Sequence, residues 1–242
     1  MFWNTSNRLI VTAIAALGCT LLITTDCLAQ TQDPQVANQF WPSLNVNFEL
    51  NSRARITGVV EKHSGEDAFY EQAKFGVTFS YRMRRIRKHL FGDVDKENEY
   101  NLSVAVGYEF RETDDGGTIK HENRLLIQST PKYILPWHIL LQNRNRIEFR
   151  WIDAEYNFRY RNKLIVDVPL KIRGFRITPF TSGELFWDRN RKAWNQNQYA
   201  FGVRWPLRKW FGVDTYYMRQ NCTTCTSDPL NIFGITTNLY FR

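Results

Sequence analysis

Charged and apolar residues alternate along much of this chain. Between residues 144 and 150, arginine or glutamate occupies each even position, while Ile147, Phe149 and Trp151 occupy odd positions. Successive side chains of an extended strand point to opposite faces, so this segment predicts a strand with one charged and one aromatic face. The same pattern recurs along most of the chain. Because only a closed barrel in lipid requires apolar residues outside and tolerates charge inside on every strand, the pattern predicts a transmembrane β-barrel.

The alternation also predicts how many strands the barrel contains. Barrels of bacterial outer membranes normally have an even number of strands, each about 10 residues long. We expect an all-β, antiparallel, up-and-down barrel of about twelve strands, with ten as the alternative. The twelfth strand would lie before Trp41. Eleven segments are visible in the sequence: 41–51, 53–61, 73–82, 100–111, 122–130, 137–151, 155–168, 175–187, 198–207, 212–220 and 233–241.

The N-terminal segment has the features of a secretory signal peptide. Arg8 precedes an uncharged apolar run, Leu9–Ile23, which is shorter than the roughly 20 residues of a spanning helix. Cys27-Leu28-Ala29 resembles a cleavage site between small residues, and a lipoprotein site at Cys19 is the weaker alternative. We therefore expect a signal peptide over residues 1–29, a polar leader over 30–40 and an outer-membrane barrel over 41–242.

Composition agrees with an exported barrel from a Gram-negative bacterium. Aromatic residues make up 15% of the chain although its mean hydropathy is −0.45, a combination that apolar residues at every second position produce. The net charge of +8 could indicate nucleic-acid binding. In a barrel it favours an anion-attracting lumen or contact with phosphate-bearing lipid, for which the basic run Met83–His89 is a candidate. Five tryptophans near expected strand ends predict interfacial girdles: Trp137, Trp151, Trp187, Trp205 and Trp210.

Two cysteines remain after cleavage, Cys222 and Cys225. Their Cys-Thr-Thr-Cys spacing predicts a local disulfide in an oxidising compartment. Zinc would need two further ligands, and a redox pair normally begins a helix in an α/β domain. We therefore expect no metal or redox role for these cysteines.

The charged face of the expected strands supplies candidate residues for the lumen. Two readings of these residues remain open: a basic track that passes small anions, or a structural network in which carboxylates neutralise arginines. The candidates for anion contact are Arg124, Arg144, Arg146, Arg150, Arg159, Arg161, Lys163 and Arg204, and their acidic partners are Glu122, Glu148, Glu155 and Glu184.

Catalytic chemistry finds little support in the sequence. His63-Ser64 and His121-Glu122 are the close combinations of histidine with a polar partner, and both lie in or beside expected loops. Asp93, Asp95 and Glu97 alternate, but a calcium loop needs a longer series and a fitted glycine. We therefore expect neither enzymatic activity nor a cofactor. A barrel enzyme, or a surface-binding protein that acts through its outer loops, is the alternative.

Four motifs stand out along the expected strands: Arg144–Arg150, Phe158–Leu164, Pro179-Phe180 followed by Glu184–Phe186, and Tyr217–Gln220. These motifs resemble those of the DUF2490 family of outer-membrane proteins, whose function is unknown. The resemblance implies an outer-membrane barrel and no established activity. We expect a narrow, porin-like, anion-preferring channel or a structural barrel. Expected partners are outer-membrane lipid and lipopolysaccharide, the barrel-assembly machinery and a small anionic solute, but no nucleic acid.

Overall fold

Twelve strands and two short 3₁₀ turns make up the barrel in the computed structural model, which describes residues 36–65, 70–85, 95–223 and 229–242. The 3₁₀ turns are η1 (Lys96–Glu99) and η2 (Pro136–His138). The strands are β1 (Ala37–Glu49), β2 (Ala54–Gly65), β3 (Tyr70–Arg85), β4 (Tyr100–Asp115), β5 (Thr118–Ile134), β6 (Leu140–Ile152), β7 (Glu155–Asp167), β8 (Leu170–Ile172), β9 (Phe175–Asp188), β10 (Ala193–Arg208), β11 (Phe211–Cys222) and β12 (Leu230–Phe241).

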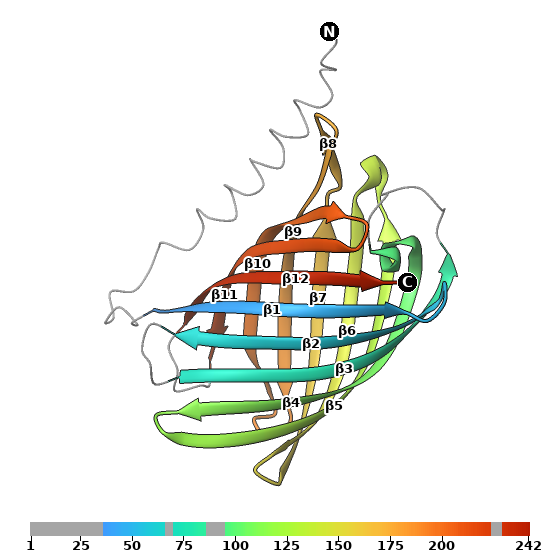
Figure 1. Cartoon of the computed structure of the whole chain (residues 1–242). Helices are drawn as coiled ribbons and strands as arrows, with labels where there is room; N and C mark the ends of the chain where they lie inside the picture. Colours follow the sequence, from blue (N-terminus) through green and yellow to red (C-terminus); the bar gives the residue numbers. More distant parts are fainter. Residues whose placement is uncertain (1–35, 66–69, 86–94, 224–228) are drawn as a thin grey trace. The chain divides into compact units, whose positions relative to one another are not determined.

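Eleven of these strands form the closed ring, and β8 extends from it in a hairpin with β9 (Figure 1). Neighbouring strands in the ring are antiparallel except at the closure, where β1 pairs with β12 in parallel. An odd number of up-and-down strands requires this parallel pair, because the first and last strands run in the same direction. The all-β barrel and the total of twelve strands are thus confirmed. The twelfth strand is the hairpin strand β8, and no strand separates β1 from β12.

The structure of β1 and β12 differs from the sequence expectations in two respects. First, β1 begins at Ala37, so the end of the expected polar leader is part of the sheet. Second, Ala37 and Phe241 lie at opposite ends of the barrel, whereas an even-stranded ring would have brought both ends of the chain to one side. The expected signal peptide, Cys225 and residues 86–89 of the basic run lie outside the described residues.

Tight turns explain how adjacent strands stay in register. Gly116 and Gly117 join β4 to β5 with φ values of 64° and 88°, a left-handed conformation that glycine adopts without steric cost. Asp153 and Ala154 join β6 to β7 with positive φ values as well. The pairing then places Arg146 beside Arg161 and Glu148 beside Arg159. Two-residue turns therefore fix which charges on β6 meet which charges on β7.

The two faces of the barrel wall differ in chemistry as the alternation predicts. Apolar side chains are exposed on the outside: Val77 is 56% exposed, Val106 47% and Phe201 63%. Polar and charged side chains occupy the buried alternate positions; Arg82 and Glu148 are both 0% exposed. Within the described residues, no helix has the length and apolar content needed to cross a membrane.

A minority of inward positions are apolar, and some of these residues form an apolar sector of the interior. Leu126, which breaks the sequence pattern, is 1% exposed and lies close to Gly107 of β4. On the other side of the ring, Tyr216 covers Gly234 so closely that a Cβ there would lie 2.0 Å from the ring. The apolar sector consists of Ala200, Met218 and Ile232, packed against Trp41, Tyr216 and Leu230.

Candidate functional site

The charged cluster is a set of ion-paired side chains on inward positions of β4, β5, β6, β7 and β9. Within the described part of the chain, ion pairs connect eight cations and five carboxylates into one network. The formal excess is three positive charges. The cations are Arg111, Arg124, Arg144, Arg146, Arg150, Arg159, Arg161 and Lys163, and the carboxylates are Glu109, Glu122, Glu148, Glu184 and Asp188.

Glu148 occupies the centre of the charged cluster. Its carboxylate lies 2.7 Å from the Arg159 guanidinium and 2.9 Å from that of Arg161. Arg124 and Arg146 approach the same carboxylate to 3.7 and 3.9 Å. The sequence produces this arrangement because Arg146 and Glu148 are two positions apart on one strand face, and β7 brings two arginines opposite them. Glu148 therefore compensates four arginines at once.

Glu184 forms a second centre on β9. It lies 2.7 Å from Arg161 and 2.9 Å from Arg144, and Lys163 is 3.7 Å away. The register of β7 with β9 places Lys163 directly beside Glu184. Arg144 and Lys163 each keep 21% of their side-chain surface exposed, while Glu184 keeps 1%. These two cations are thus the more accessible members around a buried carboxylate.

Glu122 and Glu109 bind the remaining arginines on β4, β5 and β6. Glu122 accepts two hydrogen bonds from Arg124, at 2.5 and 2.6 Å, and one from Arg150. Arg150 also lies 3.7 Å from Asp188. The contacts of Glu109 are longer, 3.2 Å to Arg111, 3.6 Å to Arg146 and 3.9 Å to Arg124. Glu109 is therefore held less tightly than Glu148 or Glu184.

Three of the sequence candidates lie elsewhere. Arg204 on β10 pairs with Asp167 and approaches Asp214 to 3.8 Å, separately from the charged cluster. Glu155 is exposed at the first residue of β7. Cys222 is disulfide-bonded at the end of β11. The other lumen candidates all belong to the charged cluster.

The sequence candidates omit Glu109, Arg111 and Asp188, which belong to the charged cluster. Glu109 and Arg111 lie on the inward face of the segment 100–111, the cleanest alternating stretch of the chain, so their positions in the alternation indicate the orientation of both side chains. The sequence candidates also omit Asp167, which is 1% exposed and accepts a hydrogen bond from Gln142. Asp167 follows three apolar residues, Leu164, Ile165 and Val166, and this local setting hid its inward orientation.

A second group of charges lies where η1 meets the barrel wall. Arg55 of β2 lies 2.6 Å from Glu49, 2.6 Å from Asp95 and 3.2 Å from Glu97. Lys132 of β5 donates to the Glu97 backbone carbonyl at 2.8 Å. We call residues 95–99 the acidic turn. It connects inward cations of β2 and β5, at the end of the barrel from which β8 extends (Figure 1).

The acidic turn is held by charge as well as by backbone contacts. The Asp95 carboxylate caps η1 by accepting a hydrogen bond from the Glu97 backbone N–H at 2.9 Å. Burial by itself raises the pKa of Asp95, but the Arg55 guanidinium, the Glu97 backbone N–H and Lys132 together outweigh burial and hold that pKa below its ordinary value. The Arg55 guanidinium also lies over the Tyr240 ring of β12, 5.7 Å from its centroid. The acidic turn therefore bridges β2 and β5, which are separated in the ring by β3 and β4.

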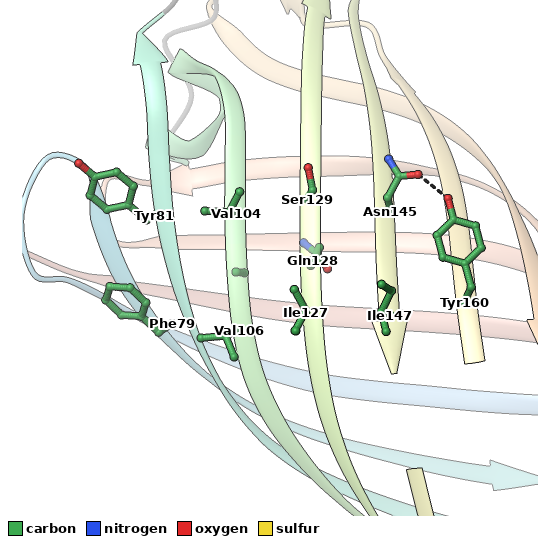
Figure 2. Close-up of a pocket in the computed structure, with 11 residues that line it drawn as sticks. Phe79, Tyr81, Val104, Val106, Ile127, Gln128, Ser129, Asn145, Ile147 and Tyr160 are labelled. Carbon is green, nitrogen blue, oxygen red and sulfur yellow. Dashed lines mark hydrogen bonds between the residues drawn. The ribbon is translucent and has the colours of Figure 1, made fainter. Parts of the chain in front are cut away.

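The outer wall carries a shallow groove across β3 to β7. Its volume is about 450 Å³, and aliphatic and aromatic side chains such as Phe79, Val106 and Ile127 line most of it (Figure 2). At one end, the Tyr160 hydroxyl donates to Oδ1 of Asn145 at 2.6 Å. The Asn162 amide donates to the same oxygen at 2.9 Å. These polar groups bond to one another within an otherwise apolar surface.

The described residues contain no candidate metal centre, because no three histidine, cysteine or acidic side chains come together among them as potential ligands. His63 stacks on Trp41 with 3.7 Å between ring centroids and hydrogen-bonds Glu61 at 2.6 Å. His121 is exposed at a strand end, 3.6 Å from Glu112. The two close histidine combinations of the sequence are thus part of local polar contacts.

Comparison with known proteins identifies a family. The family model DUF2490, described as a protein of unknown function, matches residues 38–231. No curated protein matches the sequence. Among solved structures, LpxR from Salmonella typhimurium is similar with a TM-score of 0.47 and 7% sequence identity, over 77% of this chain and 83% of that chain.

Proposed function

The chain belongs to the DUF2490 family, whose function is unknown, and we propose that it is an outer-membrane barrel that passes small anions through a narrow, arginine-rich interior. The observation that carries the proposal is the excess of cations over carboxylates in the charged cluster. A buried charge that is incompletely balanced is costly, so a formal excess of three positive charges favours the entry of mobile anions. The proposal assigns no catalytic chemistry to the barrel.

Placement in an outer membrane is supported by the outer surface of the ring. Large apolar side chains occupy its exposed positions on strand after strand, and a water-soluble protein rarely exposes so continuous an apolar surface. Aromatic residues lie toward the strand ends, where Trp151 packs against Tyr156 and Trp210 against Phe211. Such aromatic belts are typical of barrel positions at the membrane–water interface.

Inserting a charge in the outer wall tests the membrane placement. Ile127 lies near the middle of β5 and is 49% exposed, and Ile119 lies near the β4–β5 turn and is 57% exposed. We expect Ile127→Arg to lower the free energy of unfolding in lipid vesicles by about 2–4 kcal/mol, and Ile119→Arg by at most about 1 kcal/mol. Denaturant titration of vesicle-folded protein measures both. Equal effects at the two depths would argue against a wall in contact with lipid.

The partial exposure of two cations in the charged cluster supports a preference for anions. Arg144 and Lys163 each border Glu184 and keep a fifth of their surface exposed, so they can contact a passing anion. Arg161 holds the same carboxylate at 2.7 Å. Replacing the two accessible cations therefore removes positive charge while leaving Glu184 with a close partner.

The double variant Arg144→Gln with Lys163→Gln is expected to reduce anion preference in planar bilayers. The reversal potential across a KCl gradient measures the chloride-to-potassium permeability ratio, which should fall several-fold because two of the three excess charges are gone. Arg208→Gln removes an exposed cation near the β10–β11 turn and should leave the ratio unchanged. A folded protein without ion-selective openings would refute the channel and leave a structural barrel.

A further inference from the structure

We infer that Glu109 occupies a site for a small tetrahedral oxyanion, such as inorganic phosphate, from which the oxyanion displaces its carboxylate. The inference rests on the proposed function and adds a location and a ligand class to it. Three guanidiniums, from Arg111, Arg124 and Arg146, approach the Glu109 carboxylate from β4, β5 and β6. One carboxylate thus faces three positive charges.

The contacts of Glu109 are long for a buried carboxylate. Its distances to the three arginines run from 3.2 to 3.9 Å, whereas Glu148 and Glu184 have pairs of contacts between 2.7 and 2.9 Å. Charge-assisted hydrogen bonds normally measure about 2.7–2.9 Å. The two oxygens of Glu109 therefore satisfy these arginines incompletely.

Two arginine nitrogens near Glu109 have no hydrogen-bond partner in the described structure, Nε of Arg111 and Nη1 of Arg124. The other nitrogens of Arg124 are committed, because Nε and Nη2 donate to Glu122. Arg146 is likewise oriented by Gln128, to which it donates from Nε and Nη2 at 3.0 and 2.8 Å. Second contacts thus fix the guanidiniums, while the unpaired Arg124 nitrogen lies between two carboxylates, 3.9 Å from Glu109 and 3.7 Å from Glu148. Buried donors without a hydrogen bond are costly.

The shape of the donors selects the ligand class. Guanidinium groups are planar forks that pair with two oxygens of a carboxylate or phosphate. A tetrahedral oxyanion offers up to four oxygens to three arginines, where Glu109 offers two. Gly76 pairs with Glu109 across β3 and β4, and a Cβ at Gly76 would lie 3.2 Å from Cγ of Glu109. The absence of a side chain at Gly76 leaves the stem of Glu109 free to move aside.

Removing the internal carboxylate tests the inference. In Glu109→Ala, we expect phosphate to raise the unfolding midpoint of the detergent-solubilised barrel well above the effect of chloride at equal ionic strength. Wild-type protein should respond less, because Glu109 competes for the same donors. Adding Arg111→Gln to Glu109→Ala should raise the phosphate concentration needed for half the effect about tenfold, since a charge-assisted contact is lost. Glu155→Ala, at an exposed glutamate, serves as the control.

The possible results of this experiment distinguish failure of the oxyanion site from failure of the proposed channel function. If Glu109→Ala folds poorly without phosphate, refolding yield against phosphate concentration replaces the unfolding midpoint, and recovery specific to phosphate supports the site. A phosphate response no larger in Glu109→Ala than in Glu155→Ala overturns the site, even if the pore stays anion-selective in KCl. A phosphate-specific response in a barrel that conducts no ions upholds the site and refutes the channel.

Discussion

Glu148→Gln is expected to destabilise the barrel more than any other single substitution in the charged cluster. The side chain of Glu148 is fully buried, and four arginines lie within 3.9 Å of its carboxylate. Removing one partner of a buried ion pair leaves the other charge uncompensated and typically costs about 3–5 kcal/mol. We expect a loss of that size in urea unfolding of the folded barrel. The glutamine is nearly isosteric, so the loss reports charge and not packing.

Two further variants make this expectation specific. Glu155→Gln is the same substitution at an exposed glutamate, and its effect should stay within about 0.5 kcal/mol. Combining Glu148→Gln with Arg159→Gln removes a cation along with the carboxylate and should recover part of the lost stability. If Glu148→Gln were no more destabilising than Glu155→Gln, the arginines would be compensated by water or solute, and the ion pairs would contribute little to folding.

The sequence predicted the barrel from its two-residue period, because that period directly reports which face of a strand each side chain occupies. The segment 100–111 alternates without error, and the structure exposes Val106 and buries Glu109 accordingly. Leu126 broke the pattern because an inward position can be apolar where it packs on a neighbouring strand. The sequence therefore indicates which face of a strand a residue occupies. Whether an inward residue is polar or apolar depends on the side chains that it packs against in the interior.

Partners and strand count were harder to predict, because both depend on how distant segments pair. Arg161 and Glu184 are 23 positions apart and meet only through the register of β7 with β9. Eleven segments were visible in the sequence, but the even number normal for such barrels suggested a twelfth ring strand. The parallel closure of β1 on β12 has no local sequence signal, since either direction of pairing satisfies the same alternation.

The acidic turn shows how a motif can be recognised without its role. Asp95 and Glu97 alternate in the sequence, but the series is too short for a calcium loop, and the sequence predicts no other role for it. The structure pairs both with Arg55 of β2, 40 and 42 positions earlier in the chain. Asp93, the first residue of that series, lies outside the described residues. The role of an acidic pair near a strand end can therefore be predicted only when the cation that it contacts is known.

Neutralising the acidic turn is expected to widen the end of the barrel at which it lies. In Asp95→Asn with Glu97→Gln, Arg55 loses two of its three carboxylate partners, and Lys132 loses its ionic contact at 3.8 Å. The freed cations add positive charge at the mouth, and the turn is no longer held across it. If the interior conducts, single-channel conductance should rise several-fold with a stronger preference for anions. The control Glu71→Gln with Glu155→Gln removes two exposed carboxylates from the opposite end and should leave conductance unchanged.

Lowering the pH should raise the conductance of the wild-type protein, as the double substitution does at neutral pH. Because Arg55 holds the pKa of Asp95 below its ordinary value, the Asp95–Arg55 contribution is fully present above the ordinary aspartate range and is lost as the pH falls through the lowered pKa. Wild-type conductance should therefore stay low through mildly acidic pH and rise only in stronger acid. The double variant should lack that rise, because it has no Asp95 carboxylate to protonate. Conductance that is equal in both proteins at neutral pH would show that the acidic turn lies beside the conducting path and not across it.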